Sequence, residues 1–146
     1  MKLAAWNVNS LKVRLPHVLD WLQKEAPDVV CLQETKLEDH NFPADALAAA
    51  GYKTAFSGQK TYNGVALLAR AEINDIVCGN PHFDDAQKRL IAGTVNGIGC
   101  EPSPIVIATG IGASMCAASY SLFSVLSRIT AQPAVLTTST FRPCFV

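Results

Sequence analysis

The chain has 146 residues, with 12 basic and 12 acidic side chains and a formal net charge of zero. This length suits one domain, and the balanced charge argues against a protein that binds nucleic acid through an overall positive charge. Its five cysteines form no C-x-x-C pair and have no metal-ligand spacing, which argues against a zinc site. The apolar stretch after Lys2 is too short for a signal peptide and is interrupted by Asn7, so we expect a cytoplasmic protein.

The first part of the chain predicts a strand, a helix and a second strand. The first strand, Leu3 to Trp6, ends in the polar cluster Asn7-Val8-Asn9-Ser10. A helix is predicted to begin at Leu15-Pro16, because proline is tolerated in the first turn of a helix. Its buried stripe is predicted to be Leu15, Val18, Leu19 and Leu22. Ala26-Pro27 ends the helix, since the residue before proline avoids the helical region.

The second strand is an apolar run, Val29 to Leu32, that stops abruptly at Gln33-Glu34-Thr35-Lys36. A strand, helix and strand within about 34 residues indicate two adjacent parallel strands. Ligands of open α/β sheets bind at the carboxyl ends of such strands. Glu34 and Asn7 are oxygen ligands placed there, which suits Mg²⁺, or Mn²⁺ with the same ligand preference. The alternatives are a solvated glutamate and an asparagine that caps a turn.

The following residues predict a short helix and a series of strands. The helix, Ala44 to Ala50, follows Phe42-Pro43 and is closed by Gly51. Strands are predicted at residues 52–56, 65–69, 73–78 and 89–95, with turns at Asn63-Gly64 and Asn96-Gly97. The predicted fold class is therefore α/β, of the α+β type, with a mixed sheet.

The composition changes after about residue 98. Residues 101–146 contain three charged side chains, whereas the preceding hundred contain 21. Residues 102–127 carry no charge, which makes them a membrane-span candidate by length. We expect no membrane association, because prolines, glycines, serines and threonines make this stretch only mildly apolar. The alternative is a disordered or poorly packed tail.

Three motifs resemble exodeoxyribonuclease III, the bacterial abasic-site endonuclease of the endonuclease/exonuclease/phosphatase superfamily. They occur in that family's order and at about its spacing, at residues 1–11, 32–36 and 57–66. The resemblance covers residues 1 to about 98 and implies half of a four-layer α/β sandwich. It also implies a Mg²⁺-dependent DNA repair nuclease, an abasic-site endonuclease and 3′→5′ exodeoxyribonuclease. Such an enzyme hydrolyses phosphodiesters of double-stranded DNA with abasic or 3′-blocked sites.

The resemblance assigns roles to six residues. Asn7 and Glu34 correspond to metal-site residues, and Lys36, Tyr62, Asn63 and Gly64 correspond to residues that contact DNA phosphate. Four further residues after the first strand are candidates for phosphate contact: Asn9, Ser10, Lys12 and Arg14. For Lys36 the alternative is a solvated lysine, and for the turn at Tyr62 it is a plain β-turn. The later motifs of the family, Gly-Asp-Phe-Asn, Arg-Ile-Asp and Ser-Asp-His, do not occur after Ile98. No residue is therefore assigned as catalytic.

These absences lead to four expectations. Residues 1–98 form the family half-domain, and residues 99–146 form an unrelated tail produced by a shift of reading frame near Gly99. The chain is a truncated nuclease that is inactive alone; the alternative is a non-catalytic remnant or a weak metal- or DNA-binding module. The inner apolar face of the sheet lacks its partner sheet. Such a face favours self-association.

Overall fold

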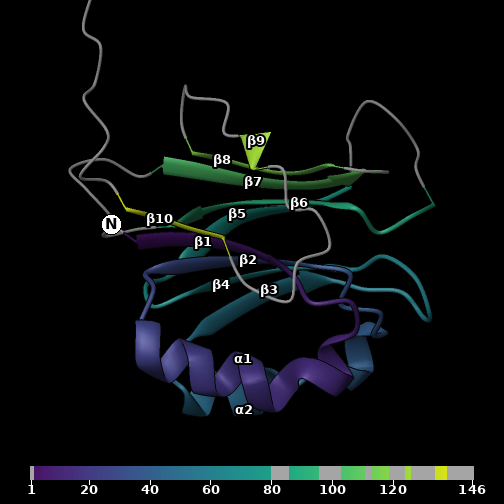
Figure 1. Cartoon of the computed structure of the whole chain (residues 1–146). Coiled ribbons are helices and arrows are strands. Elements are labelled where there is room, and N and C mark those ends of the chain that lie inside the picture. The colour runs from purple at the N-terminus through teal and green to yellow at the C-terminus, as the bar shows by residue number, and fades with distance from the viewer. Residues whose placement is uncertain are drawn as a thin grey trace, which may run out of the picture.

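The computed structural model describes residues 2–79, 86–95, 103–110, 113–118, 124–125 and 134–137, with side chains described for residues 2–79 and 86–95. These residues stack in three layers: helices, a first sheet and a second sheet (Figure 1). The helices are α1 (Leu11–Glu25), the 3-10 helix η1 (Asp39–Asn41) and α2 (Ala44–Ala49). The α/β fold class is thereby confirmed.

The first sheet has the strand order β10-β1-β2-β4-β3, and the second has the order β5-β6-β7-β8-β9. The strands of the first sheet are β1 (Lys2–Asn7), β2 (Val29–Gln33), β3 (Lys53–Ser57), β4 (Val65–Ala69) and β10 (Ala134–Thr137). The strands of the second sheet are β5 (Ile73–Cys78), β6 (Leu90–Val95), β7 (Ser103–Gly110), β8 (Ala113–Ala118) and β9 (Ser124–Val125). β1 and β2 are parallel and the other pairs are antiparallel, so the first sheet is mixed as expected.

The start of α1 was predicted wrongly. The helix begins at Leu11, four residues before the expected start at Leu15, and Pro16 lies inside it. Leu11 is fully buried against the first sheet, and its N–H donates to the carbonyl of Thr35 at 2.9 Å. Burial of Leu11 and this backbone bond offset the helical hydrogen bond that proline cannot donate. The end of the helix is as predicted, at Ala26 before Pro27.

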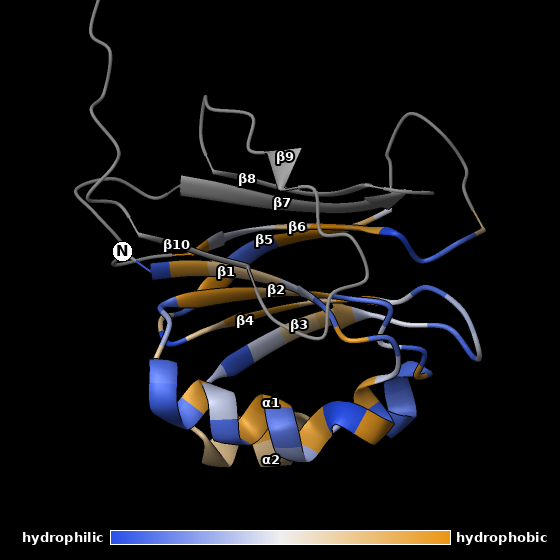
Figure 2. Ribbon diagram, viewed as in Figure 1, coloured by the Kyte–Doolittle hydropathy of each residue, from blue (hydrophilic) through white to orange (hydrophobic). Residues whose placement is uncertain are grey.

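Strands β1, β2 and β4 of the first sheet are buried on both faces, which accords with their apolar sequences (Figure 2). The face toward the helices packs on fully buried Leu11, Val18 and Leu47. The opposite face packs on Ile91 and Val95 of β6, from the second sheet. The expectation that this inner face lacks a partner sheet is therefore wrong, because β5 and β6 follow closely in the chain and turn back over it. That face gives no reason to expect self-association.

The remaining expectations for the fold have mixed outcomes. α2 ends at Ala49 and is followed by Gly51 with φ of +87°, as predicted for a helix end. No helix among the described residues is long and apolar enough to cross a membrane. Within residues 102–127 the structure describes β7, β8 and β9. The turn predicted at Asn96-Gly97 lies outside the described residues.

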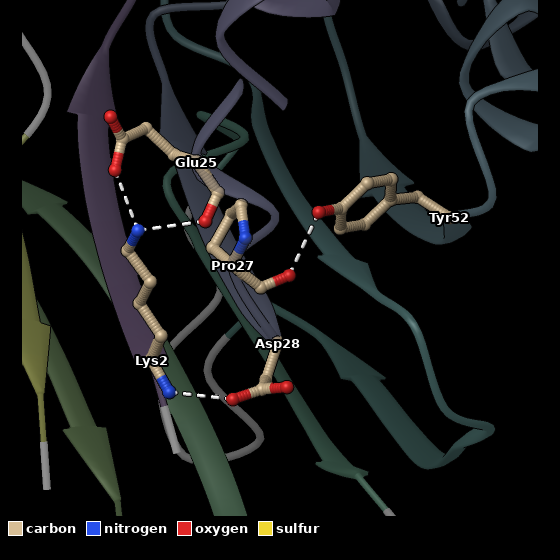
Figure 3. Close-up of polar contacts among 5 residues, drawn as sticks. All are labelled: Lys2, Glu25, Pro27, Asp28 and Tyr52. Carbon is tan, nitrogen blue, oxygen red and sulfur yellow. Dashed lines mark hydrogen bonds and ion pairs between the residues drawn. The ribbon is translucent and has the colours of Figure 1, made fainter. Parts of the chain in front are cut away.

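A polar cluster ties together the end of the first sheet where β1 and β2 begin (Figure 3). Lys2 donates from Nζ to the carbonyl oxygen and to Oε2 of Glu25, at 2.7 and 2.6 Å, and from its backbone N–H to Oδ2 of Asp28 at 2.6 Å. The hydroxyl of Tyr52 donates to the carbonyl of Pro27 at 2.8 Å. The cluster joins the loop after α1 to β1 and to the residue before β3.

Replacement of Tyr52 with phenylalanine is expected to lower the free energy of unfolding by about 1–2 kcal/mol, because the buried Pro27 carbonyl loses its donor. Burial raises the pKa of Tyr52 above 10.0; the nearby charge of Arg70 opposes this and that of Asp28 adds to it. The neutral phenol is thus favoured in the folded state. The contribution of the neutral Tyr52 phenol to the free energy of unfolding is fully present below pH 10. It is lost as the pH rises through the raised pKa of Tyr52. Urea unfolding from pH 8 to 11 should show a steeper loss for wild type than for Tyr52→Phe; parallel curves would contradict this.

Candidate functional site

Polar loops converge at the edge of the first sheet where β1 and β2 end. In the register of the sheet Asn7 lies beside Gln33, and Gln33 lies beside Val65 at the start of β4. The loop after β1, the loop after β2 and the turn before β4 therefore meet at one edge. These three loops, together with Asn7 at the end of β1, contain all six residues to which the sequence assigned a role.

Backbone hydrogen bonds clamp the loop after β2 from both sides. The N–H groups of Ser10 and Leu11 donate to the carbonyls of Glu34 and Thr35 at 2.8 and 2.9 Å. On the other side, the N–H of Thr35 donates to Gly64 at 3.2 Å and the N–H of Lys36 donates to Asn63 at 2.9 Å. The position of Glu34 is thus set by the helix start on one side and by the Asn63-Gly64 turn on the other.

Unusual backbone conformations are concentrated at this edge. Eight non-glycine residues of the described chain have positive φ, and six of them lie in these three loops. These six are Asn9, Ser10, Glu34, Lys36, Thr61 and Asn63. A non-glycine residue in this region costs of order 1–3 kcal/mol and persists where the surrounding structure imposes it. Strain of this kind is typical of functional sites, so the cluster supports a binding role for this edge.

The positive φ of Gly64 and its close approach to the Thr35 side chain explain the glycine at the turn. Gly64 has φ of +85°, and a Cβ atom placed on it would lie 2.2 Å from Oγ1 of Thr35. Its N–H donates to the carbonyl of Lys88 at 2.9 Å. Gly64 therefore joins the loop after β2 to the segment before β6, and only a residue without a side chain fits there.

The candidate metal-site residues form a chain of polar contacts. Oδ1 of Asn7 accepts from the N–H of Asn9 at 3.1 Å. Oδ1 of Asn9 accepts from Nζ of Lys36 at 2.6 Å, and the same Nζ lies 3.6 Å from Oε2 of Glu34. Glu34 and Lys36 are each about one-third exposed or less, with 30% and 27% of the side chain accessible. A partly exposed carboxylate, that of Glu34, thus lies beside the Lys36 ammonium, which is also bonded to the Asn9 carboxamide.

The turn before β4 presents an aromatic side chain to solvent. Tyr62 is 68% exposed, which is unusual for so large a side chain. Its neighbour Asn63 is held in place, because its Nδ2 donates to Oε1 of Gln87 at 3.1 Å. The backbone of Lys88 is fixed by Oε1 of Gln59 at 2.7 Å. The turn is therefore held by hydrogen bonds on either side of Tyr62, whose phenol is exposed.

The edge is basic although the chain is neutral. Residues 7–14, 34–39, 58–64 and 86–89 make up the loops and the first helical turn at this edge. They contain six basic side chains, Lys12, Arg14, Lys36, Lys60, Lys88 and Arg89, and three acidic ones, Glu34, Glu38 and Asp39. A local net charge of +3 attracts phosphate without an overall basic charge.

Sequence reasoning overlooked Gln33. It is fully buried on the same face of the sheet as Asn7, and its Oε1 has no hydrogen-bond partner among the described residues. Its Nε2 makes a long contact of 3.4 Å with the carbonyl of Cys31. The signal was available, since a polar residue ended an otherwise apolar buried strand. An oxygen without a donor beside Asn7 is compatible with a ligand or donor that comes from outside the described residues.

Replacement of Gln33 with methionine is expected to raise the free energy of unfolding by about 1 kcal/mol, because it removes a buried acceptor without a donor. The matched control is Gln59→Met, which removes the acceptor of the Lys88 N–H. This variant is expected to lower the free energy of unfolding by about 1 kcal/mol. Urea titration followed by tryptophan fluorescence measures both. A Gln33→Met variant that is as destabilised as Gln59→Met would show that the Gln33 carboxamide has a partner.

The donor set fits a hard cation but does not complete its coordination. Glu34 and Asn7 would supply oxygen ligands, and Gln33 lies beside Asn7 in the register of β1 and β2. Within the part of the chain that the structure describes, no group of three His, Cys, Asp or Glu residues could hold a metal. Mg²⁺ commonly uses one or two carboxylates and completes its shell with water and substrate phosphate. The residues at this edge are compatible with that mode and not with an all-protein cage.

The layered fold and this edge define a member of the Endonuclease/Exonuclease/phosphatase family. Residues 4–136 of the chain match that family, and the chain belongs to it. The family match extends beyond residue 98, while the division of the chain near that residue stays a prediction.

The relatives that the chain resembles include DNA repair enzymes. It is 43% identical over 93 residues to exodeoxyribonuclease III of Haemophilus influenzae, covering 62% of this chain and 34% of that protein. It is 36% identical over 84 residues to DNA repair nuclease APEX1 of Danio rerio, covering 54% of this chain and 27% of that protein. The chain thus spans about a third of the length of these relatives.

Solved structures with the same fold are also similar in sequence. A 3′ phosphatase, NExo, from Neisseria, bound to a product DNA hairpin, superposes with a TM-score of 0.71 at 44% identity, covering 77% of this chain and 43% of that one. An AP endonuclease from Archaeoglobus fulgidus superposes with a TM-score of 0.64 at 39% identity, covering 66% of this chain and 38% of that one.

Proposed function

We propose that the edge formed by residues 7–14, 34–36 and 61–64 is one half of the site of a Mg²⁺-dependent DNA repair nuclease. The lineage is that of abasic-site endonucleases and 3′→5′ exodeoxyribonucleases, as the names of the relatives indicate. The observation that carries the proposal is the backbone clamp on residues 34–36, which holds Glu34 at a basic edge with its carboxylate 3.6 Å from the ammonium of Lys36.

Each residue has a role that follows from its position. Glu34 and Asn7 would hold Mg²⁺, which would neutralise charge on a phosphodiester. Lys36 and the turn at Asn63-Gly64 would hold phosphate oxygens, and Tyr62 offers an exposed hydroxyl and ring to the DNA backbone. Mg²⁺ and Mn²⁺ both favour such oxygen ligands, so Mn²⁺ can replace Mg²⁺ as a probe.

We infer that this chain alone binds metal and DNA but does not hydrolyse DNA. Hydrolysis needs a base that activates water and groups that stabilise the transition state. The motifs that supply them by resemblance do not occur after Ile98. Catalytic groups act as a unit, so the loss of several leaves little rate. A reading-frame shift near Gly99 would account for this, and the downstream DNA should then encode the lost motifs in another frame.

The test uses a labelled duplex with one abasic-site analogue, incubated with the chain in Mg²⁺ or in EDTA. The expected result is Mg²⁺-dependent binding without nicking, with binding lost in Glu34→Ala and retained in the nearby carboxylate control Glu38→Ala. Metal-dependent nicking that Glu34→Ala abolishes would overturn the inference of inactivity and support the nuclease assignment.

The second candidate is a non-catalytic remnant that binds neither metal nor DNA. The missing motifs favour it, whereas the strained and clamped loops favour a retained binding site. Absence of Mg²⁺-dependent binding by a folded chain would select this candidate.

A further inference from the structure

Lys36 occupies the position of a counter-ion to Glu34. Its Nζ lies 3.6 Å from Oε2 of Glu34 and donates a hydrogen bond of 2.6 Å to Oδ1 of Asn9. Both backbones are fixed by the clamp, and both have positive φ, 56° for Glu34 and 53° for Lys36. The side chain of Lys36 is therefore the movable part of this arrangement.

We propose that Lys36 is an exchangeable counter-ion, which lowers the affinity of Glu34 for a divalent cation until DNA phosphate draws its ammonium away. This inference rests on the proposed metal site. An ammonium that already neutralises Glu34 weakens the attraction of a second cation to the same carboxylate. The two side chains are 27% and 30% exposed, so solvent ions can reach them and exchange is sterically open.

DNA supplies the alternative partner for the ammonium. The edge carries a local charge of +3, and the lysine side chain has four flexible methylene groups that let Nζ turn outward. When phosphate takes up the ammonium, the charge of Glu34 becomes available to the metal. Metal and DNA should then bind cooperatively, each raising the affinity of the other by the same factor.

A purely structural role for Lys36 makes the opposite prediction. If the bond from Nζ to Asn9 mainly holds the loop after β1 in place, removal of the lysine should disorder the site and weaken metal binding. The direction of the change in metal affinity therefore separates the two roles, without any measurement of DNA cleavage.

The test is a titration of the chain with Mn²⁺, followed by the electron paramagnetic resonance signal of the free ion. Lys36→Met is expected to bind Mn²⁺ about tenfold more tightly than wild type, the size of effect for charges a few ångströms apart at a solvated site. Lys36→Arg keeps the charge and should bind as wild type does. Lys60→Met is the matched control, because Lys60 lies at the same edge and makes no ion pair with a described residue.

A second measurement tests the coupling to DNA. Fluorescence anisotropy of a labelled intact duplex gives the DNA affinity of the chain with and without Mg²⁺, at constant ionic strength. The gain in DNA affinity on adding Mg²⁺ should be smaller for Lys36→Met than for wild type. An unchanged or lower Mn²⁺ affinity in Lys36→Met, or an unchanged gain, would overturn the counter-ion role and leave the proposed function standing. No Mn²⁺ binding by folded wild type would overturn both.

Discussion

The Gly64→Ala variant is expected to lose about 3 kcal/mol of unfolding free energy and to lose metal and DNA binding at the same time. Alanine at φ of +85° costs about 1–2 kcal/mol, and its Cβ would lie 2.2 Å from Oγ1 of Thr35. Relief of that overlap forces the turn away from the loop after β2, at a further cost of about 1–3 kcal/mol. The bonds from Thr35 and Lys36 to this turn then lengthen or break, and Glu34 loses its fixed position.

Gly51→Ala is the matched control for this prediction. Gly51 has nearly the same φ, +87°, but nothing lies within 4 Å of a Cβ placed on it. The Gly51→Ala variant should lose only about 1 kcal/mol of unfolding free energy and should bind metal as wild type does. Urea unfolding followed by tryptophan fluorescence measures the stability of both variants. The signal comes from Trp6 and Trp21, which pack edge to face with their ring centroids 5.7 Å apart. Equal losses for the two alanines would contradict the clamp as the reason for glycine at position 64.

The Glu34→Gln variant is expected to weaken Mn²⁺ binding by at least about tenfold while the fold stays intact. The substitution keeps the size of the side chain and removes the charge that attracts the cation. Substitution of residues that hydrogen-bond to the ligands of a metal typically lowers metal affinity by about 10- to 100-fold. Loss of a ligand itself should have at least that effect. Calorimetric titration with Mn²⁺ measures the change.

The stability of Glu34→Gln separates a lost ligand from a lost fold. Its ion pair with Lys36 is partly exposed, so removing it should change the unfolding free energy by no more than about 1 kcal/mol. Glu38→Gln, at a second carboxylate four residues further along the chain, should leave Mn²⁺ affinity unchanged. Equal affinity losses in the two variants would mean that general electrostatics, and not a site at Glu34, attract the cation.

The strands, and the edge at which the candidate residues lie, could be predicted from local patterns. The run Val29 to Leu32 is closed by polar residues, and the structure confirms a strand at Val29–Gln33 with Glu34 directly after it. The parallel pairing of β1 with β2 followed from the helix between them. The placement of Asn7 and Glu34 at one edge followed from the ends of adjacent parallel strands, and that of the Asn63-Gly64 turn from the family resemblance. The backbone bonds now explain how the loops meet.

Other features depend on contacts that no local pattern shows. The early start of α1 depends on Leu11, whose N–H bonds to Thr35 more than twenty residues away. Coverage of the inner face depends on Ile91 and Val95, which alternate with less buried residues in β6. The contact of Lys36 with Asn9 spans 27 residues and arises only when two loops meet.

The most direct test is to locate the metal on the protein. Amide spectra of ¹⁵N-labelled chain should be recorded with substoichiometric Mn²⁺, which broadens signals of nearby nuclei. The amide signals of residues 7–10, 33–36 and 61–64 are expected to broaden first. Those of Lys2, at the start of β1, and of Tyr52, just before β3, lie about 15 Å away and are expected to keep more of their intensity. Broadening centred elsewhere, or spread evenly over the chain, would contradict a metal site at Glu34.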